Sequence, residues 1–422
     1  MGYADAFSSF SHKNYRYYFT GQGISLIGTW MQTVAMGWLV YSLTGSSAKL
    51  GAYGFLNMIP SLIFGYLAGA LSDRVEKKKA LFWTQGAAML SAFFLAYLTS
   101  SGKATYSAVL LIGFINGTAG AFDMPLRQSF TVEIVGKDLL PNAIALNSIM
   151  FNSSRMIGPA LGGFIIKYWG EKTCFWLNFV SYFFIMAALY KIKPYTVKKN
   201  KTSSSLLEDL KSGITYMKNS QYISYPLIFL SFMSFVIMPV ITLLPVYVSR
   251  LNGDAGTMGI FMSLIGLGAI ISGLRMAGKK ENKNMSKQIY SYSLLYAFSL
   301  AALSFSNHIW ISALFLFTAG MGTARQAVGI NTLIQSLVRE DMRGRVVSVY
   351  ALSFTALAPF GNMFWGWIGE KYGINYSLFA ASLWALFANI WFIRKMYLFK
   401  KKNYLAGSDS KFYSNPELTE II

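Results

Sequence analysis

Long apolar segments alternate with short polar ones along the whole chain. A helix needs about 20 mostly apolar residues to cross a bilayer. Twelve runs approach or exceed that length, at residues 16–43, 49–71, 80–99, 104–126, 141–168, 173–190, 222–249, 257–277, 288–306, 309–331, 346–369 and 374–396. Glycine and proline within the runs do not argue against helices, because membrane helices tolerate both. The pattern predicts an all-α membrane protein with twelve transmembrane helices.

The runs form two sets of six, separated by a segment rich in Lys and Ser. We expect four regions: an N-terminal six-helix bundle (1–190), a cytoplasmic linker (191–221), a C-terminal six-helix bundle (222–402) and a cytoplasmic tail (403–422). Within the linker, Ser205 and Glu208 have the spacing of a capping box. The apolar residues that follow recur at helical spacing, which predicts a short amphipathic helix.

Identical residues recur at a fixed distance in the two halves. Three pairs lie 203 positions apart, namely Gly65 and Gly268, Val135 and Val338, and Asp138 and Asp341. Each pair falls at loops of equal rank in the two sets of runs. Internal repeats of this kind are typical of transporters. The two bundles are therefore predicted to be pseudo-symmetric.

Composition excludes several classes of protein. The chain is 54% hydrophobic and 13% charged, whereas soluble domains carry about 25% charged residues. A disulfide framework is excluded because Cys174 is the only cysteine. His12 and His308 are the only histidines, too few for a His-rich metal site. With no recognisable nucleophile or catalytic acid pair, we expect no enzyme, no cofactor and no bound metal.

The net charge of +20 is distributed unevenly among the loops. Most of the 37 basic residues fall on one side, in segments 74–79, 191–218, 279–287, 339–345 and 395–402. Because cytoplasmic loops carry an excess of Lys and Arg, both termini and the central loop are predicted to be cytoplasmic. The basic loops then face anionic lipids of the inner leaflet rather than a nucleic acid. The first run is too long for a signal peptide and is expected to be retained.

A first motif ends the second run. Glycines four apart permit close helix approach, and an acid followed by basic residues can clamp a neighbouring helix end. The motif consists of Gly65, Gly69, Asp73, Arg74, Lys77 and Lys78. It resembles the loop signature of the major facilitator superfamily, although Glu76 stands where that signature has glycine. The resemblance implies a gating role for Asp73; the alternative is a helix-end charge in a basic loop.

A second motif lies in the fifth run. It comprises Ser154, Gly158, Pro159, Gly162 and Gly163. Its small residues allow tight packing, and its proline removes a backbone hydrogen bond and bends the helix. It resembles the antiporter motif of exporters in the same superfamily, with a serine in place of the first glycine. The alternative is an ordinary kinked membrane helix.

Three further sequence segments, at residues 28–32, 123–128 and 142–148, narrow the resemblance to one branch of the superfamily. They look like the bacterial branch that includes enterobactin-exporter-like and macrolide-efflux-like proteins. The resemblance implies a monomeric secondary transporter of the bacterial cytoplasmic membrane. It implies export of a siderophore, drug or metabolite by alternating access, with protons as the coupling ion. An importer on the same fold and a non-transporting receptor or scaffold remain alternatives.

Ionisable residues within a membrane are functional candidates. Arg155 lies about 21 Å along the fifth run, near the midplane, and Trp30 and Gln32 have similar depths in the first run. No acidic residue shares this depth. Arg155 therefore either contacts an anionic or oxygen-rich ligand or pairs with amides such as Gln32, Asn116 or Asn152. Other candidates either line the cavity or bond across helices: Gln22, Ser25, Asn57 and Asn147.

Asp123 is the most deeply embedded carboxylate in the sequence. It either exchanges a proton during transport or holds the loop that carries Arg127. Burial raises a carboxyl pKa while a nearby arginine lowers it, so sequence alone leaves both roles open. The first run contains no acid, although some proton-coupled exporters have one there.

Overall fold

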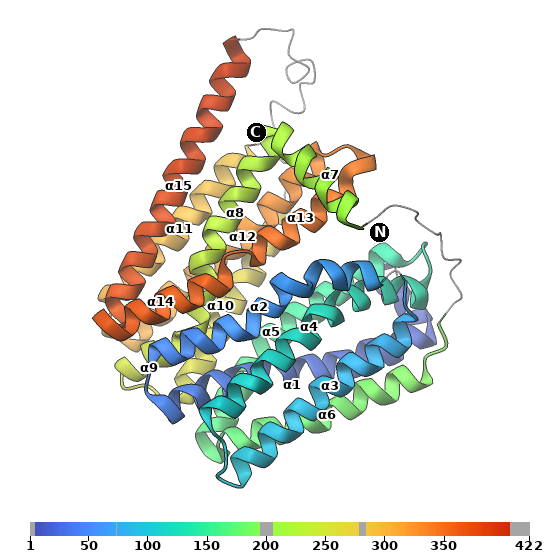
Figure 1. Ribbon diagram of the computed structural model, residues 1–422, viewed down its shortest axis with the longest axis vertical. Coiled ribbons are helices and arrows are strands. Elements are labelled where there is room, and N and C mark those ends of the chain that lie inside the picture. Colours follow the sequence, from blue (N-terminus) through green and yellow to red (C-terminus); the bar gives the residue numbers. More distant parts are fainter. Residues whose placement is uncertain (1–4, 73, 195–205, 278–283, 406–422) are drawn as a thin grey trace. The chain divides into compact units, whose positions relative to one another are not determined.

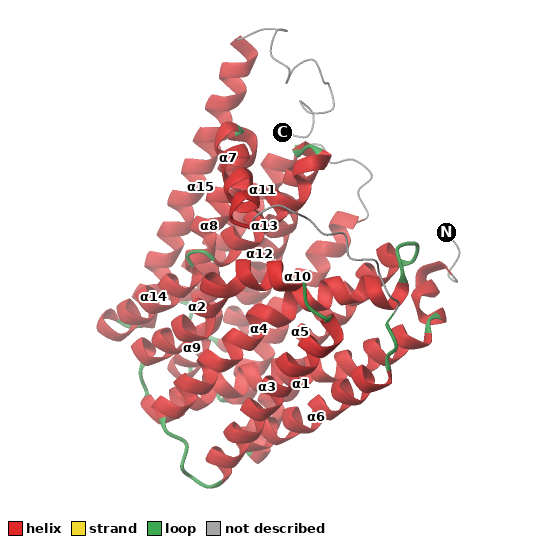
Figure 2. Cartoon of the chain, turned by 45° about the vertical axis from the view of Figure 1, so that its right-hand side comes forward, coloured by secondary structure: helices red, strands yellow, loops and turns green. Residues whose placement is uncertain are grey.

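The computed structural model describes the chain except for residues 1–4, 73, 195–205, 278–283 and 406–422. Every regular element in the described ranges is a helix, as Figure 2 shows by colour. The helices form two compact units. Unit 1 comprises Met1–Thr202 together with Leu244–Ser263, and unit 2 comprises Ser203–Leu243 together with Leu264–Ile422.

Unit 1 contains the helices of the first half and a short piece of the second (Figure 1). Its elements are η1 (Asp5–Ser11), α1 (Lys13–Thr44), α2 (Ser47–Ser72), α3 (Lys77–Ser100), α4 (Tyr106–Val135), α5 (Leu140–Trp169), α6 (Glu171–Lys191), α9 (Leu244–Arg250) and the start of α10 (Ala255–Ala277). Helix α1 packs against α5 and α6, and α2 packs against α4. Tyr15, Phe130 and Tyr182 belong to its buried core.

Unit 2 contains the remainder of the second half. Its elements are α7 (Leu206–Asn219), α8 (Gln221–Thr242), the end of α10, α11 (Met285–Phe305), α12 (Ile309–Leu337), η2 (Glu340–Met342), α13 (Arg343–Thr355), α14 (Ala358–Tyr372) and α15 (Ile374–Leu405). Helix α11 packs against α12 and α15. Helix α7 lies in the segment where the amphipathic linker helix was predicted, and it packs against α13. Ser205 of the predicted capping box lies outside the described residues.

Two of the twelve apolar runs are not single helices. Run 222–249 divides into α8 and α9 at Leu243, shortly after Pro239 and just before Pro245. Run 346–369 divides into α13 and α14, and the second piece begins with Pro359 in its first turn. Proline lacks an N–H and is favoured in the first turn of a helix, so Pro245 and Pro359 each begin a new helix instead of continuing the preceding one.

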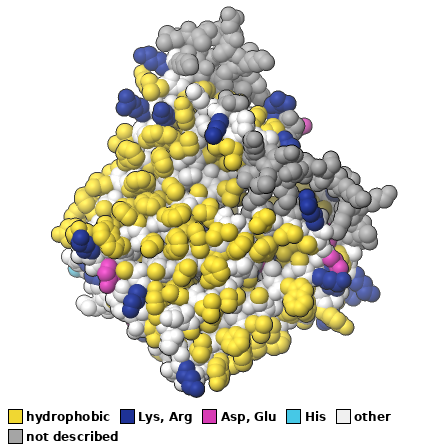
Figure 3. All heavy atoms as spheres, in the orientation of Figure 1, with side chains coloured by type: hydrophobic (Ala, Val, Ile, Leu, Met, Phe, Trp, Pro, Cys, Tyr) yellow, Lys and Arg dark blue, Asp and Glu magenta, His cyan; other side chains and the backbone are white. Residues whose placement is uncertain are grey.

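The membrane character of the helices follows from their length and apolarity. Eight segments of the described chain are long and apolar enough to cross a membrane by these criteria. The count of twelve crossings stays a prediction. Large hydrophobic side chains are exposed, among them Trp83, Tyr190 and Trp310. Figure 3 shows hydrophobic side chains over most of the described surface on one face, with Lys and Arg side chains few and near its margins. Such a surface suits contact with lipid.

Corresponding glycines make close helix crossings in each unit. A Cβ at Gly117 would collide with the carbonyl oxygen of Asn57, where α4 crosses α2. A Cβ at Gly320 would collide with the carbonyl oxygen of Ile265, where α12 crosses α10. Gly117 and Gly320 are 203 positions apart, the spacing of the sequence repeat. The duplication is therefore visible in the packing of each unit as well as in the sequence.

Candidate functional site

Arg155 and Trp30 are brought together by α5 and α1. The guanidinium carbon of Arg155 lies 5.8 Å from the centre of the Trp30 ring, a cation–π distance. Phe151, one turn earlier on α5, meets the same indole edge-to-face at 5.9 Å. Arg155 is half-buried, and among the described residues it makes no hydrogen bond or ion pair. A cation held against an aromatic face, with its donors unused, is suited to bind an oxygen-rich or anionic group.

The amides predicted as alternative partners of Arg155 bond elsewhere. Gln32 Oε1 accepts a hydrogen bond of 2.7 Å from Asn178 Nδ2 on α6. Asn152 Nδ2 donates to the Ser148 carbonyl in its own helix. Asn116 is half-buried, with no hydrogen bond to Arg155 among the described residues. These amides therefore do not compensate the charge of Arg155.

Two other predicted cavity residues cross-link helices within unit 1. Asn57 Nδ2 donates to the Gly113 carbonyl at 3.0 Å and joins α2 to α4. Asn147 joins three helices, because it accepts from the Tyr15 hydroxyl and donates to Thr131 Oγ1. The geometry favours the packing interpretation for this pair of asparagines.

Gln22 and Ser25 on α1 are fully buried, with exposures of 1% and 0%. Gln22 Nε2 and Ser25 Oγ find no hydrogen-bond partner among the described residues. Buried polar groups are nearly always bonded. These two atoms therefore remain candidates for ligand contact.

Asp123 is surrounded by donors. Its Oδ1 accepts hydrogen bonds from Thr84 Oγ1 at 2.9 Å and Gln85 Nε2 at 2.5 Å, both on α3. Its other oxygen pairs with Arg127, one turn later on α4. The carboxylate is 8% exposed. These contacts tie α4 to α3 through the Asp123 carboxylate.

The antiporter-type motif places its glycines at helix crossings. A Cβ at Gly158 would collide with Trp30 Cβ, and one at Gly162 would lie 3.1 Å from Met31 Cα, so both allow α5 to approach α1. Ser154 and Pro159 are buried in α5. The motif therefore brings α1 and α5 close enough for Trp30 to lie under Arg155.

The motif at the end of the second run, from Gly65 to Lys78, does not place its glycines at a helix crossing. A Cβ at Gly65 or Gly69 would meet no described atom within 4 Å, so neither glycine makes the close crossing that the sequence suggested. Asp73 lies outside the described residues, and Arg74 begins the turn after α2. Lys77 and Lys78 do bind neighbouring segments, with Lys77 paired to Glu133 at 2.6 Å and Lys78 donating to the Ile192 carbonyl.

Within unit 1, α5 contacts α10 and α1 contacts α9, in each case near the C-terminal end of the first helix of the pair. A Cβ at Gly163 would lie 2.5 Å from the Ala255 carbonyl oxygen and 2.8 Å from Gly259 Cα. We refer to this crossing of Gly163 with Ala255 and Gly259 as the α5–α10 contact. Beside it, the Tyr41 hydroxyl donates to Ser249 Oγ at 2.9 Å. Glycines on both helices bring the two backbones together.

An ion pair flanks the α5–α10 contact. Lys167 Nζ lies 3.0 Å from Asp254 Oδ2, and both side chains are nearly half exposed. Partial burial alone raises the pKa of Asp254, but hydrogen bonds from the Thr257 backbone and Lys167 outweigh it and hold the pKa below its usual value. The pair is therefore charged at neutral pH. Because both side chains are largely solvated, the pair contributes little to stability and separates at little cost.

One cluster was missed by the sequence analysis. Arg325 on α12 is 4% exposed and donates from Nη2 to Gln288 Oε1 on α11. Its guanidinium also lies 5.5 Å from the centre of the Tyr292 ring. The signal was present, since Arg325 is a charge inside the apolar run 309–331.

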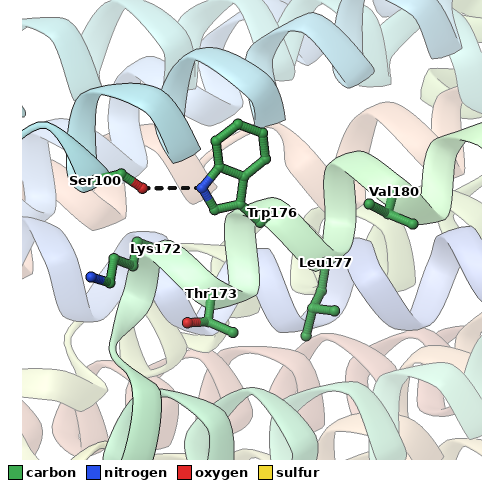
Figure 4. Close-up of a pocket in the computed structure, with 6 residues that line it drawn as sticks. All are labelled: Ser100, Lys172, Thr173, Trp176, Leu177 and Val180. Carbon is green, nitrogen blue, oxygen red and sulfur yellow. Dashed lines mark hydrogen bonds between the residues drawn. The ribbon is translucent and has the colours of Figure 1, made fainter.

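Unit 1 also contains a groove. It has a volume of about 390 Å³ and is lined by Ser100, Lys172, Thr173, Trp176, Leu177 and Val180. Figure 4 shows the Trp176 indole N–H donating to Ser100 Oγ, at 3.0 Å. None of the predicted site residues lines it. We assign it no role in transport.

Comparisons with known proteins agree with the fold. The family model described as transmembrane secretion effector matches residues 4–421. The staphyloferrin A transporter of Staphylococcus aureus (strain NCTC 8325 / PS 47) is 26% identical over 370 residues, which cover 85% of this chain and 90% of the relative. The macrolide efflux protein A of Streptococcus pyogenes is 20% identical over 364 residues, covering 84% and 89%.

A third relative and a solved structure complete the comparison. The enterobactin exporter EntS of Shigella flexneri is 22% identical over 337 residues, covering 80% of each chain. The crystal structure of the nucleoside transporter NupG superposes with a TM-score of 0.73 at 12% identity, covering 91% of this chain and 99% of that one. At this identity the structural likeness shows the fold alone.

Proposed function

Because the chain belongs to the transmembrane secretion effector family of the major facilitator superfamily, we propose that it exports a small amphipathic or anionic molecule across the bacterial cytoplasmic membrane. It is a secondary transporter by family. The named relatives move a siderophore or a macrolide out of the cell or across the membrane. Staphyloferrin A, enterobactin and macrolides are therefore the first compounds to test.

The observation that carries the proposal is the uncompensated charge of Arg155. A cation within a membrane helix is costly unless something satisfies it. In the described chain, Arg155 contacts the Trp30 face and no anion. An anionic or oxygen-rich cargo supplies the missing acceptors, while aromatic rings such as Trp30 and Phe151 accommodate its apolar part.

Alternating access requires contacts that form and break in turn. The α5–α10 contact is suited to this role, because glycine backbones separate without leaving a large side chain unpaired. The Lys167–Asp254 pair beside it is weak enough to open. With both termini in the cytoplasm, this end of unit 1 faces outside. At the opposite end, the cytoplasmic gate is assigned to the motif whose sequence includes Asp73, and Lys77 of this motif is bound to Glu133.

Proton antiport is the proposed source of energy, with Asp123 as the carrier. Protonation of Asp123 would weaken its pairing with Arg127 and its hydrogen bonds from Thr84 and Gln85. These partners join α3 to α4. A change in protonation would therefore alter helix packing directly.

Inverted membrane vesicles test the direction of transport. Respiration acidifies their lumen, so a proton-coupled exporter should accumulate staphyloferrin A, enterobactin or a macrolide inside them. Accumulation should stop when a protonophore collapses the gradient. Greater uptake into intact cells than into inverted vesicles would identify an importer, and absence of flux in both preparations would favour a receptor or scaffold.

Cysteine labelling tests the proposed topology. Cys174 is buried and is the only cysteine, so a Cys174→Ala background is suitable. In that background, Lys49→Cys and Lys371→Cys should react with a membrane-impermeant maleimide added to intact cells. Lys199→Cys should react only after the membrane is opened. Labelling of Lys199→Cys in intact cells would overturn the assignment of the central loop to the cytoplasm.

A further inference from the structure

Unit 2 holds a buried polar cluster that the export proposal does not use. Arg325 and its neighbour Gln326 on α12 are 4% and 1% exposed. One guanidinium nitrogen of Arg325, Nη2, donates to Gln288. Its Nε and Nη1 atoms find no hydrogen-bond partner among the described residues, and neither do the two amide atoms of Gln326. Four buried polar atoms on adjacent residues are thus left without partners.

The charge of Arg325 is uncompensated as well. No acidic side chain pairs with it in the described part of the chain, and its aromatic neighbour Tyr292 presents a ring face. Burying an unpaired charge in a medium of low dielectric constant is expensive, while a paired and hydrogen-bonded charge is tolerated. An anion at this position would therefore bind favourably.

The equivalent place in unit 1 shows what is missing. Gln288 and Gln326 lie 203 positions after Gln85 and Asp123, the repeat distance of this chain. In unit 1, Gln85 donates to the Asp123 carboxylate, and Arg127 balances its charge. In unit 2, the repeat places the neutral amide of Gln326 where unit 1 has the Asp123 carboxylate, and it places Ile330 where unit 1 has Arg127. Arg325 stands where unit 1 has Phe122, so the cluster in unit 2 has gained a cation of its own and lost the carboxylate.

The unpartnered atoms indicate the chemistry of the ligand. Arg325 and the Gln326 amide nitrogen supply donors, which suit a carboxylate. The Gln326 amide oxygen is an acceptor and requires a donor, which a simple carboxylate lacks. A hydroxycarboxylate carries both groups. We propose that Arg325 and Gln326, with Gln288 orienting the guanidinium, form a binding site within unit 2 for a small hydroxycarboxylate.

The position of the cluster places it near the cytoplasm. Arg325 lies sixteen residues after Ile309, about 24 Å along α12, and Gln288 lies in the first turn of α11. Under the proposed topology, both positions fall in the cytoplasmic half of the membrane. The ligand would therefore enter from the cytoplasm. Binding at this site is separate from export and is measurable without transport.

Malate and succinate provide a matched pair of probes, because they differ by one hydroxyl group. We expect the purified full-length protein, titrated by calorimetry at constant ionic strength, to bind malate about tenfold more tightly than succinate, the effect of one buried hydrogen bond. Arg325→Gln should weaken malate binding by at least about tenfold. Gln326→Leu should weaken malate more than succinate and so remove the preference.

Lys287→Gln is the control, since it removes an exposed positive charge next to Gln288. It should leave malate binding unchanged, which separates a specific site from general attraction by a basic surface. Equal binding of malate and succinate would refute the hydroxycarboxylate assignment. Undiminished malate binding in Arg325→Gln would refute the site, as would absence of malate binding to the wild type. If Arg325→Gln fails to fold, Gln326→Leu still tests the preference. None of these results depends on whether the protein exports its cargo.

Discussion

The Arg155→Gln variant should lose an anionic cargo far more than a neutral one. Glutamine keeps some hydrogen bonding but removes the charge. Loss of a charged partner in a partly buried site costs about 2 kcal/mol or more, roughly a 30-fold weaker affinity. A neutral analogue of the same size should change much less. Binding of both analogues to purified protein, normalised to the folded fraction, measures the difference.

Two companion variants make this comparison specific. Arg155→Lys retains the charge but cannot reproduce the planar guanidinium contact, so it should also bind the anion poorly. Arg275→Gln removes an exposed arginine at the end of α10 and should bind both analogues as the wild type does. Equal losses of both analogues in Arg155→Gln would mean that Arg155 stabilises the fold rather than the cargo.

The second large effect is expected at the α5–α10 contact. In Gly163→Ala, the new methyl group would lie 2.5 Å from the Ala255 carbonyl oxygen, too close for the helices to keep their crossing. Such overpacking costs about 1–3 kcal/mol. The state in which α5 and α10 separate does not bear this cost, so its population should rise about 30-fold for 2 kcal/mol. Transport should slow because one conformation is disfavoured.

The labelling rate of a cysteine placed at position 37 measures the population of the state in which α5 and α10 are separated. The Cβ of this cysteine would fit in ordinary contact with Met258 and Pro245, from α10 and α9, and would be covered by them. In a Cys174→Ala background, Gly37→Cys should therefore label slowly from outside, and Gly163→Ala should accelerate its labelling. Gly273→Ala is the control, because a Cβ there meets no described atom within 4 Å. Equal labelling rates with Gly163→Ala and Gly273→Ala would show that the α5–α10 contact is not a gate.

The helices were largely predictable because the bilayer imposes a length and an apolar composition on each crossing. The breaks at Leu243 and before Pro359 were not predicted, since membrane helices tolerate proline and its effect depends on neighbouring packing. The close approach of Gly163 to Gly259 was not predicted either. These glycines are distant in sequence, and only the folded chain shows that they meet.

Charge and depth in the sequence were enough to single out Arg155 and Trp30, which the structure brings into contact, while their role in transport stays a proposal. Arg155 stood out as a lone cation in an apolar run, and Trp30 shared its depth. Gln32 shares that depth too, but two residues along a helix turn the side chain by about 200°, so it faces Asn178 on α6 instead. Arg325 satisfied the same rule as Arg155 and was overlooked. The sequence could not show that Thr84 and Gln85 donate to Asp123, because it does not reveal which face of α3 packs against α4.

Metabolite profiling of a deletion strain tests the central claim of export most directly. Small molecules in the medium and in the cells are compared by mass spectrometry for the wild type, the deletion strain and the complemented strain. The proposal predicts at least one anionic compound that is depleted in the medium and enriched in the cells of the deletion strain. Complementation with the wild-type chain should restore its distribution, and complementation with Arg155→Gln should not. A compound with the opposite distribution, or no difference among the strains, would contradict export.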